Sequence, residues 1–325
     1  MKMHGHDCVL ITGGCGAIGS QVINVLKKRY PDTKFVNVDA LTYAGKTQSI
    51  EPPYSNYMFY HANICDQTRM MMIFKTEKPT LMIHFAAETH VDSSFGNSLH
   101  FTETNVIGTH TLLECAKAYN GFKTIIHMST DEVYGPIEGE SAKETTSIFA
   151  PTNPYAATKA AAEMICQAYM KSFNLPIIIT RCNNAVSKVQ HVEKLIPQTI
   201  MRLSRGEKIP VHGDGNAKRT FIHTTDIANA MDIIAEKGEK HTVYNIGTTH
   251  EWSVLDVITE VAQVMNVNKD IQELVEFVEN RPFQDIRYSV DTTALQALGW
   301  SETISFTEAL HECINHYYTF LSQRA

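Results

Sequence analysis

The chain opens with a short apolar run, a glycine-rich turn and an amphipathic segment, in that order. The run at 8–12 has the length of a buried strand, and glycines at 13, 14, 16 and 19 follow it directly. Residues 20–30 then repeat apolar side chains at helical spacing. Such a turn presents backbone N–H groups at the start of a helix, where a pyrophosphate binds. The sequence therefore predicts a dinucleotide-binding loop made by Gly13, Gly16, Ala17, Ile18 and Gly19.

An acidic residue predicts which dinucleotide is bound. A second apolar run, residues 35–39, ends in Asp39, which lies 20 residues beyond Gly19. A carboxylate at this place accepts from the two ribose hydroxyls of NAD and repels the 2′-phosphate of NADP. The alternative is an aspartate that only caps a turn after the strand. The spacing favours the first interpretation, so we predict NAD as the cofactor.

Apolar runs alternate with helical patterns along the first part of the chain. Further strands are expected at 57–61, 81–86, 124–129 and 177–182, and helices at 67–78, 99–120 and 155–173. This alternation predicts an α/β fold, a doubly wound parallel sheet with helices on both faces. After residue 183 the pattern is irregular, with helical runs near 194–205, 224–236, 253–265 and 305–321. We expect a dinucleotide-binding domain at 1–182, rejoined by about 220–248, and a smaller, mainly substrate-binding domain at 183–325.

Composition excludes several classes of protein. The 325 residues are 43% hydrophobic and 19% charged, as in an ordinary globular enzyme. A net charge of −7 argues against nucleic-acid binding. No apolar run has the form of a signal peptide or the length of a membrane span. The seven cysteines are scattered and form no C-x-x-C pair. We therefore expect reduced thiols, a cytoplasmic location and no metal site.

Two later segments carry acid–base groups. Tyr155 and Lys159 are four residues apart, so a helix places them on one face, and a nearby ammonium lowers the pKa of a phenol. The alternative, a packed tyrosine with a solvated lysine, is less favoured beside a dinucleotide loop. Residues 129–135 add Asp131 and Glu132 at the end of a predicted strand, where the alternative is a surface pair. Two further carboxyl groups indicate alcohol oxidation followed by another proton transfer.

These motifs resemble the extended short-chain dehydrogenase/reductases, which have a Rossmann sheet, and more narrowly the nucleotide-sugar 4,6-dehydratases. The resemblance runs nearly end to end, through residues 85–92, 129–135, 193–197, 212–215, 243–247, 280–285 and 298–300. Residues 91–98 and 280–283 are closer to UDP-glucose 4,6-dehydratases of rhamnose synthesis than to dTDP-glucose enzymes. The resemblance thus implies conversion of UDP-glucose to UDP-4-keto-6-deoxyglucose. Alternatives are a dTDP-glucose 4,6-dehydratase, a nucleotide-sugar 4-epimerase and a non-catalytic dinucleotide sensor.

The resemblance also implies a role for each reacting group. Tyr155 takes the proton of the 4-hydroxyl, which Thr130 also hydrogen-bonds, and Lys159 binds the nicotinamide ribose. Glu132 removes the proton on carbon 5. Asp131, protonated, gives its proton to the departing 6-hydroxyl.

Further binding residues follow from the same resemblance. For the cofactor they are Asn63, Ile64, Ala86, Ala87 and Asn105, beside those already named. For the sugar or diphosphate they are Glu88, His90, Asn184, Glu193, Lys194, Arg219 and Arg281. Asn63 replaces a usual aspartate but keeps an oxygen that accepts from the adenine amino group. For Glu193 and Lys194 the alternative is a solvated helix start.

One segment departs from the family pattern. Residues 185–192 lack the glycine, the two prolines and the aromatic residues that the family has there, which puts the shape of the pocket lid in question. The family also implies a homodimer through helices at 99–119 and 155–173. The apolar faces of these helices, which either meet the partner or the sheet, include Leu112, Leu113, Met164 and Ile165.

Overall fold

A parallel sheet of seven strands organises the protein. The computed structural model describes residues 1–52, 54–145 and 149–322. The strand order is β10 (Val243–Ile246), β6 (Ile177–Cys182), β5 (Thr124–Thr130), β4 (Leu81–His84), β1 (Cys8–Thr12), β2 (Lys34–Asp39) and β3 (Tyr57–His61). All neighbouring strands in this sheet pair in parallel. The predicted doubly wound α/β fold is confirmed.

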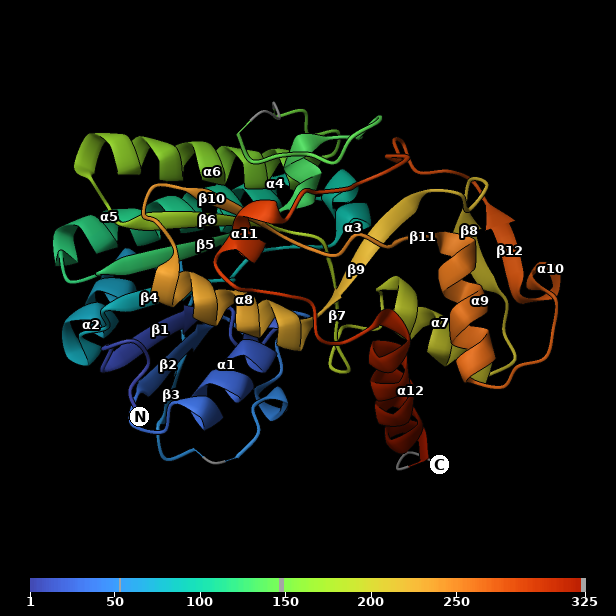
Figure 1. Cartoon of the computed structure of the whole chain (residues 1–325), viewed down its shortest axis with the longest axis horizontal. Helices are drawn as coiled ribbons and strands as arrows, with labels where there is room; N and C mark the ends of the chain where they lie inside the picture. Colours follow the sequence, from blue (N-terminus) through green and yellow to red (C-terminus); the bar gives the residue numbers. More distant parts are fainter. Residues whose placement is uncertain (53, 146–148, 323–325) are drawn as a thin grey trace.

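Helices cover both faces of this sheet. One face packs against α1 (Ala17–Arg29) and α8 (Thr224–Lys237), and the other against α2 (Gln67–Glu77), α5 (Thr109–Tyr119) and α6 (Pro154–Phe173). Figure 1 shows α8 lying beside α1, although about 200 residues separate them in the chain. The segment from α8 to β10 thus returns to the sheet, where β10 pairs with β6.

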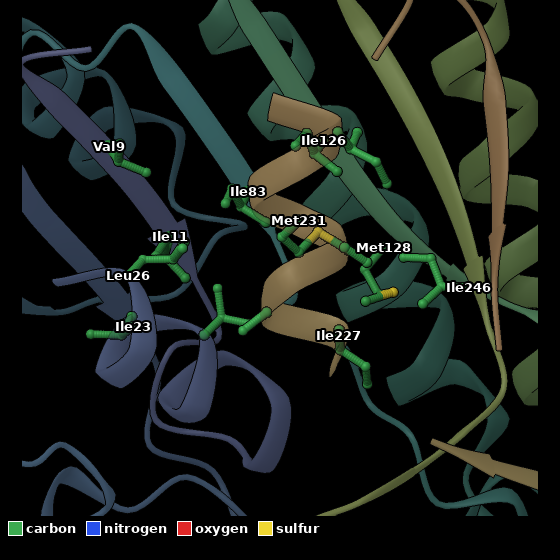
Figure 2. Packing of buried hydrophobic residues seen from close by; sticks show 14 of the residues in the cluster. Val9, Ile11, Ile23, Leu26, Ile83, Ile126, Met128, Ile227, Met231 and Ile246 are labelled. Atoms are coloured by element: carbon green, nitrogen blue, oxygen red, sulfur yellow. The ribbon is translucent and has the colours of Figure 1, made fainter. Parts of the chain in front are cut away.

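The core beneath α1 and α8 comes from alternate residues of the strands. Because successive side chains of a strand point to opposite faces, Val9 and Ile11 face these helices while Leu10 faces the other side. Figure 2 shows how Ile83 and Met231 meet in this layer. Each is fully buried, and burial of such a side chain stabilises the fold by about 1.5–3 kcal/mol. This packing fixes the strand ends that carry the site.

The C-terminal part forms a second, smaller layer beside the sheet (Figure 1). β7 (Asn184–Val186), β9 (Lys218–His223) and β11 (Glu251–Ser253) form one small sheet, and β8 (Ile209–His212) pairs with β12 (Val275–Val278). A separate apolar cluster joins α7 (Leu195–Ser204), α9 (Val254–Val264) and α12 (Phe306–Ser322). The short helices α10 (Ile271–Leu274) and α11 (Thr293–Ala297) complete it.

The predicted helix at 99–120 is three pieces. After α3 (Val91–Gly96), the chain forms α4 (Ser98–Phe101), a π-helical stretch η2 (Thr102–Gly108) and then α5. Asn105 lies in this wider π turn and makes two hydrogen bonds with the backbone of Glu88. Its Oδ1 accepts from the Glu88 N–H at 2.8 Å, and its Nδ2 donates to the Glu88 carbonyl at 3.0 Å. Asn105 also donates to Thr158 Oγ1 at 2.9 Å. The stretch that departs from regular α-helical spacing thus carries tertiary contacts to two other segments.

Within the described residues, no helix is long and apolar enough to span a bilayer. The seven cysteines are all free thiols.

Candidate active site

The carboxyl ends of five strands meet at one edge of the sheet. The glycine turn follows β1, Asp39 ends β2, and residues 86–88 follow β4. Residues 130–132 end β5 and enter the 3₁₀ turn η3 (Asp131–Tyr134), and Asn183 follows β6. Parallel strands deliver these segments to one place, which is where ligands bind in sheets of this kind.

The glycine turn is shaped by close backbone contacts. Gly13 has φ +70°, and a Cβ there would lie 2.5 Å from the Ala86 nitrogen. A Cβ on Gly19 would lie 2.4 Å from the Gly13 carbonyl oxygen. Gly16 caps α1 without a side chain, and the first turn, with Ala17 and Ile18, has no acidic residue. The N-terminus of α1 therefore keeps its N–H groups for an anion, which fits the pyrophosphate of a dinucleotide.

Asp39 is held in place by two backbone N–H groups. Its two carboxylate oxygens accept from the Cys15 and Leu41 backbone N–H groups, each at 2.8 Å. The side chain is 8% exposed. Each oxygen retains a lone pair for a ribose hydroxyl, and the residues present therefore fit NAD.

The other predicted cofactor residues differ in what they offer. Asn63 is exposed, and its Oδ1 already accepts from the Cys65 N–H at 2.9 Å, which leaves one lone pair. Ile64 is buried beneath Gly108. Ala87, like Ala86, lies in the loop after β4. Asn105 donates its two amide hydrogens to the Glu88 carbonyl and to Thr158 Oγ1, so its side chain holds protein segments together and has no hydrogen left to donate to a ligand.

Tyr155 and Lys159 are buried one turn apart on α6, at 8% and 4% exposure. Lys159 Nζ donates to the Met128 carbonyl at 2.7 Å, and burial lowers the pKa of Lys159 to about 8. Burial, and after it the Glu132 carboxyl, raises the pKa of Tyr155. The predicted lowering of the tyrosine pKa by Lys159 is therefore wrong for this arrangement, because desolvation of the phenol dominates.

The pKa values of the two carboxyl groups at the end of β5 are raised toward neutral pH. Burial raises the pKa of Asp131 to about 6. Burial, followed by the Asp131 charge, raises the pKa of Glu132 to about 7. Each carboxyl has its own amide donor: Asn183 Nδ2 lies 2.7 Å from Asp131 Oδ2, and Asn153 Nδ2 lies 3.0 Å from Glu132 Oε2. Thr130 Oγ1 donates to Asp131 Oδ1 at 3.2 Å. One acid–base pair thus lies beside the phenol.

A second polar cluster joins the loop after β4 to the C-terminal part. Lys194 Nζ donates to the Thr89 carbonyl at 3.0 Å. His90 and Glu193 approach to 3.6 Å, and Arg281 pairs with Asp92 at 2.6 Å. The structure therefore brings together four of the predicted substrate residues at the contact between these two parts of the chain.

Of the remaining predicted substrate residues, Glu88 lies within the electrostatic reach of Glu193, while Arg219 and Asn184 belong to β9 and β7. Glu88 is buried, its pKa is raised by burial, and His100 Nε2 lies 3.3 Å from its Oε1. Arg219 stacks over the Tyr288 ring at 4.3 Å, and its charge acts on Asp131 and Glu132. Asn184 begins β7 and is exposed.

A family model described as GDP-mannose 4,6 dehydratase matches residues 10–313. The chain belongs to this family. It is 42% identical over 313 residues to a trifunctional UDP-glucose 4,6-dehydratase/UDP-4-keto-6-deoxy-D-glucose 3,5-epimerase/UDP-4-keto-L-rhamnose-reductase of Arabidopsis thaliana, covering 95% of this chain and 47% of the relative. The chain thus spans about half the length of that curated relative.

Relatives of similar length act on a different nucleotide. A dTDP-D-glucose 4,6-dehydratase of Mus musculus is 38% identical over 95% of this chain and 88% of its own. The crystal structure of a dTDP-glucose 4,6-dehydratase from Streptomyces venezuelae, with NAD bound, superposes with a TM-score of 0.91. It is 34% identical, over 97% of this chain and 98% of its own. The predicted family is confirmed, and NAD agrees with this solved relative.

Sequence reasoning missed both amides of the dehydratase-like site. Asn153 directly precedes Pro154, and an asparagine before a proline is a helix-start signal, with the asparagine as cap. That signal predicts the cap, although not the contact with Glu132. Asn183 stands beside the predicted Asn184, but only the fold shows that its amide reaches Asp131.

The segment 185–192, which departs from the expected family pattern, is held by contacts with distant parts of the chain. Lys188 Nζ lies 3.4 Å from Glu51 Oε1 and 3.2 Å from Glu312 Oε1, so it joins the loop after β2 to α12. Tyr317 donates to the Gln190 carbonyl at 2.5 Å. Two ion pairs and a tyrosine thus hold this segment against α12 and the loop after β2.

Proposed function

We propose that this protein catalyses the NAD-dependent 4,6-dehydration of UDP-glucose, with UDP-4-keto-6-deoxyglucose as the product. The observation that carries the proposal is the Asp131–Glu132 pair beside Tyr155, in which Asp131 is buried and Glu132 is partly buried. Removal of water needs a base for carbon 5 and an acid for the 6-hydroxyl. The pKa values of both carboxyl groups are raised toward neutral pH, so either group can hold or release a proton there. A 4-epimerase, which eliminates nothing, needs no such pair.

The proposed roles begin with oxidation at carbon 4. When bound, NAD supplies the acceptor for the hydride that leaves carbon 4 and later returns to carbon 6, and it also supplies a positive charge. Positive charge beside Tyr155 opposes the effect of burial and favours the phenolate that takes the 4-hydroxyl proton. Thr130 is proposed to hold the same hydroxyl, and Lys159 to bind the nicotinamide ribose. The glycine turn, Asp39 and the loops at 63–64 and 86–87 bind the cofactor.

Elimination requires Glu132 ionised and Asp131 protonated. Burial raises the pKa of both groups toward neutral pH, and the charge of Asp131 raises the pKa of Glu132 further. The pair can therefore share one proton near neutral pH, because the first ionisation disfavours the second.

The sugar nucleotide is proposed to bind from the C-terminal side. Arg219 and Arg281 suit a diphosphate, because guanidinium groups bind paired oxygens with two hydrogen bonds. Arg281 must then exchange Asp92 for the ligand. Glu193, Lys194, His90, Glu88 and Asn184 are proposed to hold the sugar and its neighbours. With seven free thiols, we place the enzyme in the cytoplasm.

We expect a higher kcat/KM for UDP-glucose than for dTDP-glucose. The support is the resemblance of residues 91–98 and 280–283 to the UDP-glucose enzymes. Incubation with each nucleotide in parallel, with mass spectrometry for loss of water, measures the preference. A higher kcat/KM for dTDP-glucose would contradict it, while a product of unchanged mass would point to the epimerase instead.

We propose that the active form is a homodimer through η2 and α6. Ile107 and Met164 on these adjoining helices are 50% and 59% exposed, whereas Leu112 and Leu113 pack against the sheet. Changing both Ile107 and Met164 to Glu should give a monomer, because two charges would be buried in the interface. Light scattering measures this, with Met72→Glu on α2 as control. A monomeric wild type would refute the dimer.

A further inference from the structure

Asn153 links the base of the proposed elimination to the helix that carries Tyr155. It is 7% exposed and caps α6, since its Oδ1 accepts from the Ala156 N–H at 2.9 Å. Its Nδ2 donates to Glu132 Oε2 at 3.0 Å. Both ends of one amide are therefore used, one by the helix start and one by the carboxyl group.

We propose that Asn153 is a positioning residue for the elimination, holding Glu132 by a hydrogen bond that favours the ionised form, which removes the carbon 5 proton, a role that rests on the proposed dehydration. The helix N–H orients the amide, because only its oxygen accepts that bond. Nδ2 must then face Glu132, and an N–H group there favours the carboxylate over the acid. A residue that only caps the helix has no such preference.

The carboxyl group of Glu132 has several charged or titratable neighbours. Asp131 lies on its own element, Tyr155 on α6 and Tyr288 in the loop before α11. Arg219 on β9 and Lys194 before α7 supply positive charge. Asn153 itself does not titrate, so its replacement alters the surroundings of Glu132 without removing a charge.

Two substitutions separate capping from positioning. Aspartate and serine cap helices about as well as asparagine, so both preserve the start of α6. Asn153→Asp replaces the donor with a second carboxylate, and Asn153→Ser removes the donor without adding charge. Asp66→Asn, at the exposed cap of α2, is the matched control for an amide–carboxyl exchange far from the site.

The first measurement is the titration of Glu132 itself. In protein with carbon-13 glutamate side chains, the signal lost in Glu132→Gln identifies the residue. We expect the midpoint of the Glu132 titration to rise by roughly half a pH unit in Asn153→Ser and by about one pH unit or more in Asn153→Asp, with no change in Asp66→Asn. An unmoved titration in both variants, with α6 intact, would overturn the proposal. Should Asn153→Asp fail to fold, Asn153→Ser decides.

The second measurement is the pH dependence of kcat with UDP-glucose and dTDP-glucose. The pH below which kcat falls should rise together with the midpoint of the Glu132 titration. Water loss near pH 7 should then fall about tenfold for each pH unit of that displacement. Reduced cofactor should accumulate, because oxidation does not need Glu132. A fall in kcat without a displaced limb would mean that Asn153 is merely structural. If wild-type enzyme released no water from either nucleotide sugar, the proposed function would be wrong. The titration of Glu132 would still show whether the Asn153 amide favours the carboxylate.

Discussion

Glu132→Gln should slow water loss from the nucleotide sugar by roughly 10²–10⁴-fold while oxidation at carbon 4 continues. The amide keeps the shape of the side chain but accepts no proton from carbon 5. Tyr155 and Lys159 are unchanged, so the first step proceeds and the reduced cofactor builds up. Absorbance of the reduced cofactor during a single turnover, with mass spectrometry of the product, measures both steps.

Glu138→Gln is the matched control for this change. Glu138 is an exposed glutamate in the loop that follows η3, and its replacement should leave both steps at the wild-type rate. If Glu132→Gln instead stalled before any cofactor was reduced, Glu132 would have no separate role as the elimination base.

Tyr155→Phe should block the reaction at its start, with no reduced cofactor and a loss of rate of roughly 10²–10⁴-fold or more. The change removes one hydroxyl and keeps the ring, which packs edge-on against Phe101 at 6.4 Å. A fold defect is therefore not expected. The same single-turnover absorbance measures the outcome, and circular dichroism checks that α6 is intact.

Tyr169→Phe supplies the control for the tyrosine. Tyr169 lies on the same helix but hydrogen-bonds Glu114, away from the acid pair. We expect wild-type cofactor reduction in that variant. Normal reduction in Tyr155→Phe would show that another group takes the 4-hydroxyl proton.

Local pattern was enough to predict the parts of the site that lie at strand ends. The glycine turn and Asp39 follow from the order of strand, turn and helix, and the parallel sheet then delivers Thr130 to the same edge. Spacing alone also placed Tyr155 and Lys159 on one helical face. These features depend on residues close in sequence and on general rules for parallel sheets.

What could not be predicted depends on contacts between distant segments. The pKa of Tyr155 is set by desolvation, which requires the packed structure, and Lys159 turns to the Met128 carbonyl of β5. The π-helical stretch contains Asn105, which binds Glu88, and this pairing leaves no periodic signal. Asp92 as the partner of Arg281 likewise joins segments about 190 residues apart.

The central claim is that oxidation, elimination and reduction occur in one site, on one sugar. The most direct measurement uses nucleotide glucose with deuterium at carbon 4, and in parallel unlabelled substrate in heavy water. The account predicts that deuterium from carbon 4 appears at carbon 6 of the product, and that solvent deuterium enters at carbon 5. Loss of the label to solvent, or its recovery at carbon 4 in a product of unchanged mass, would contradict it.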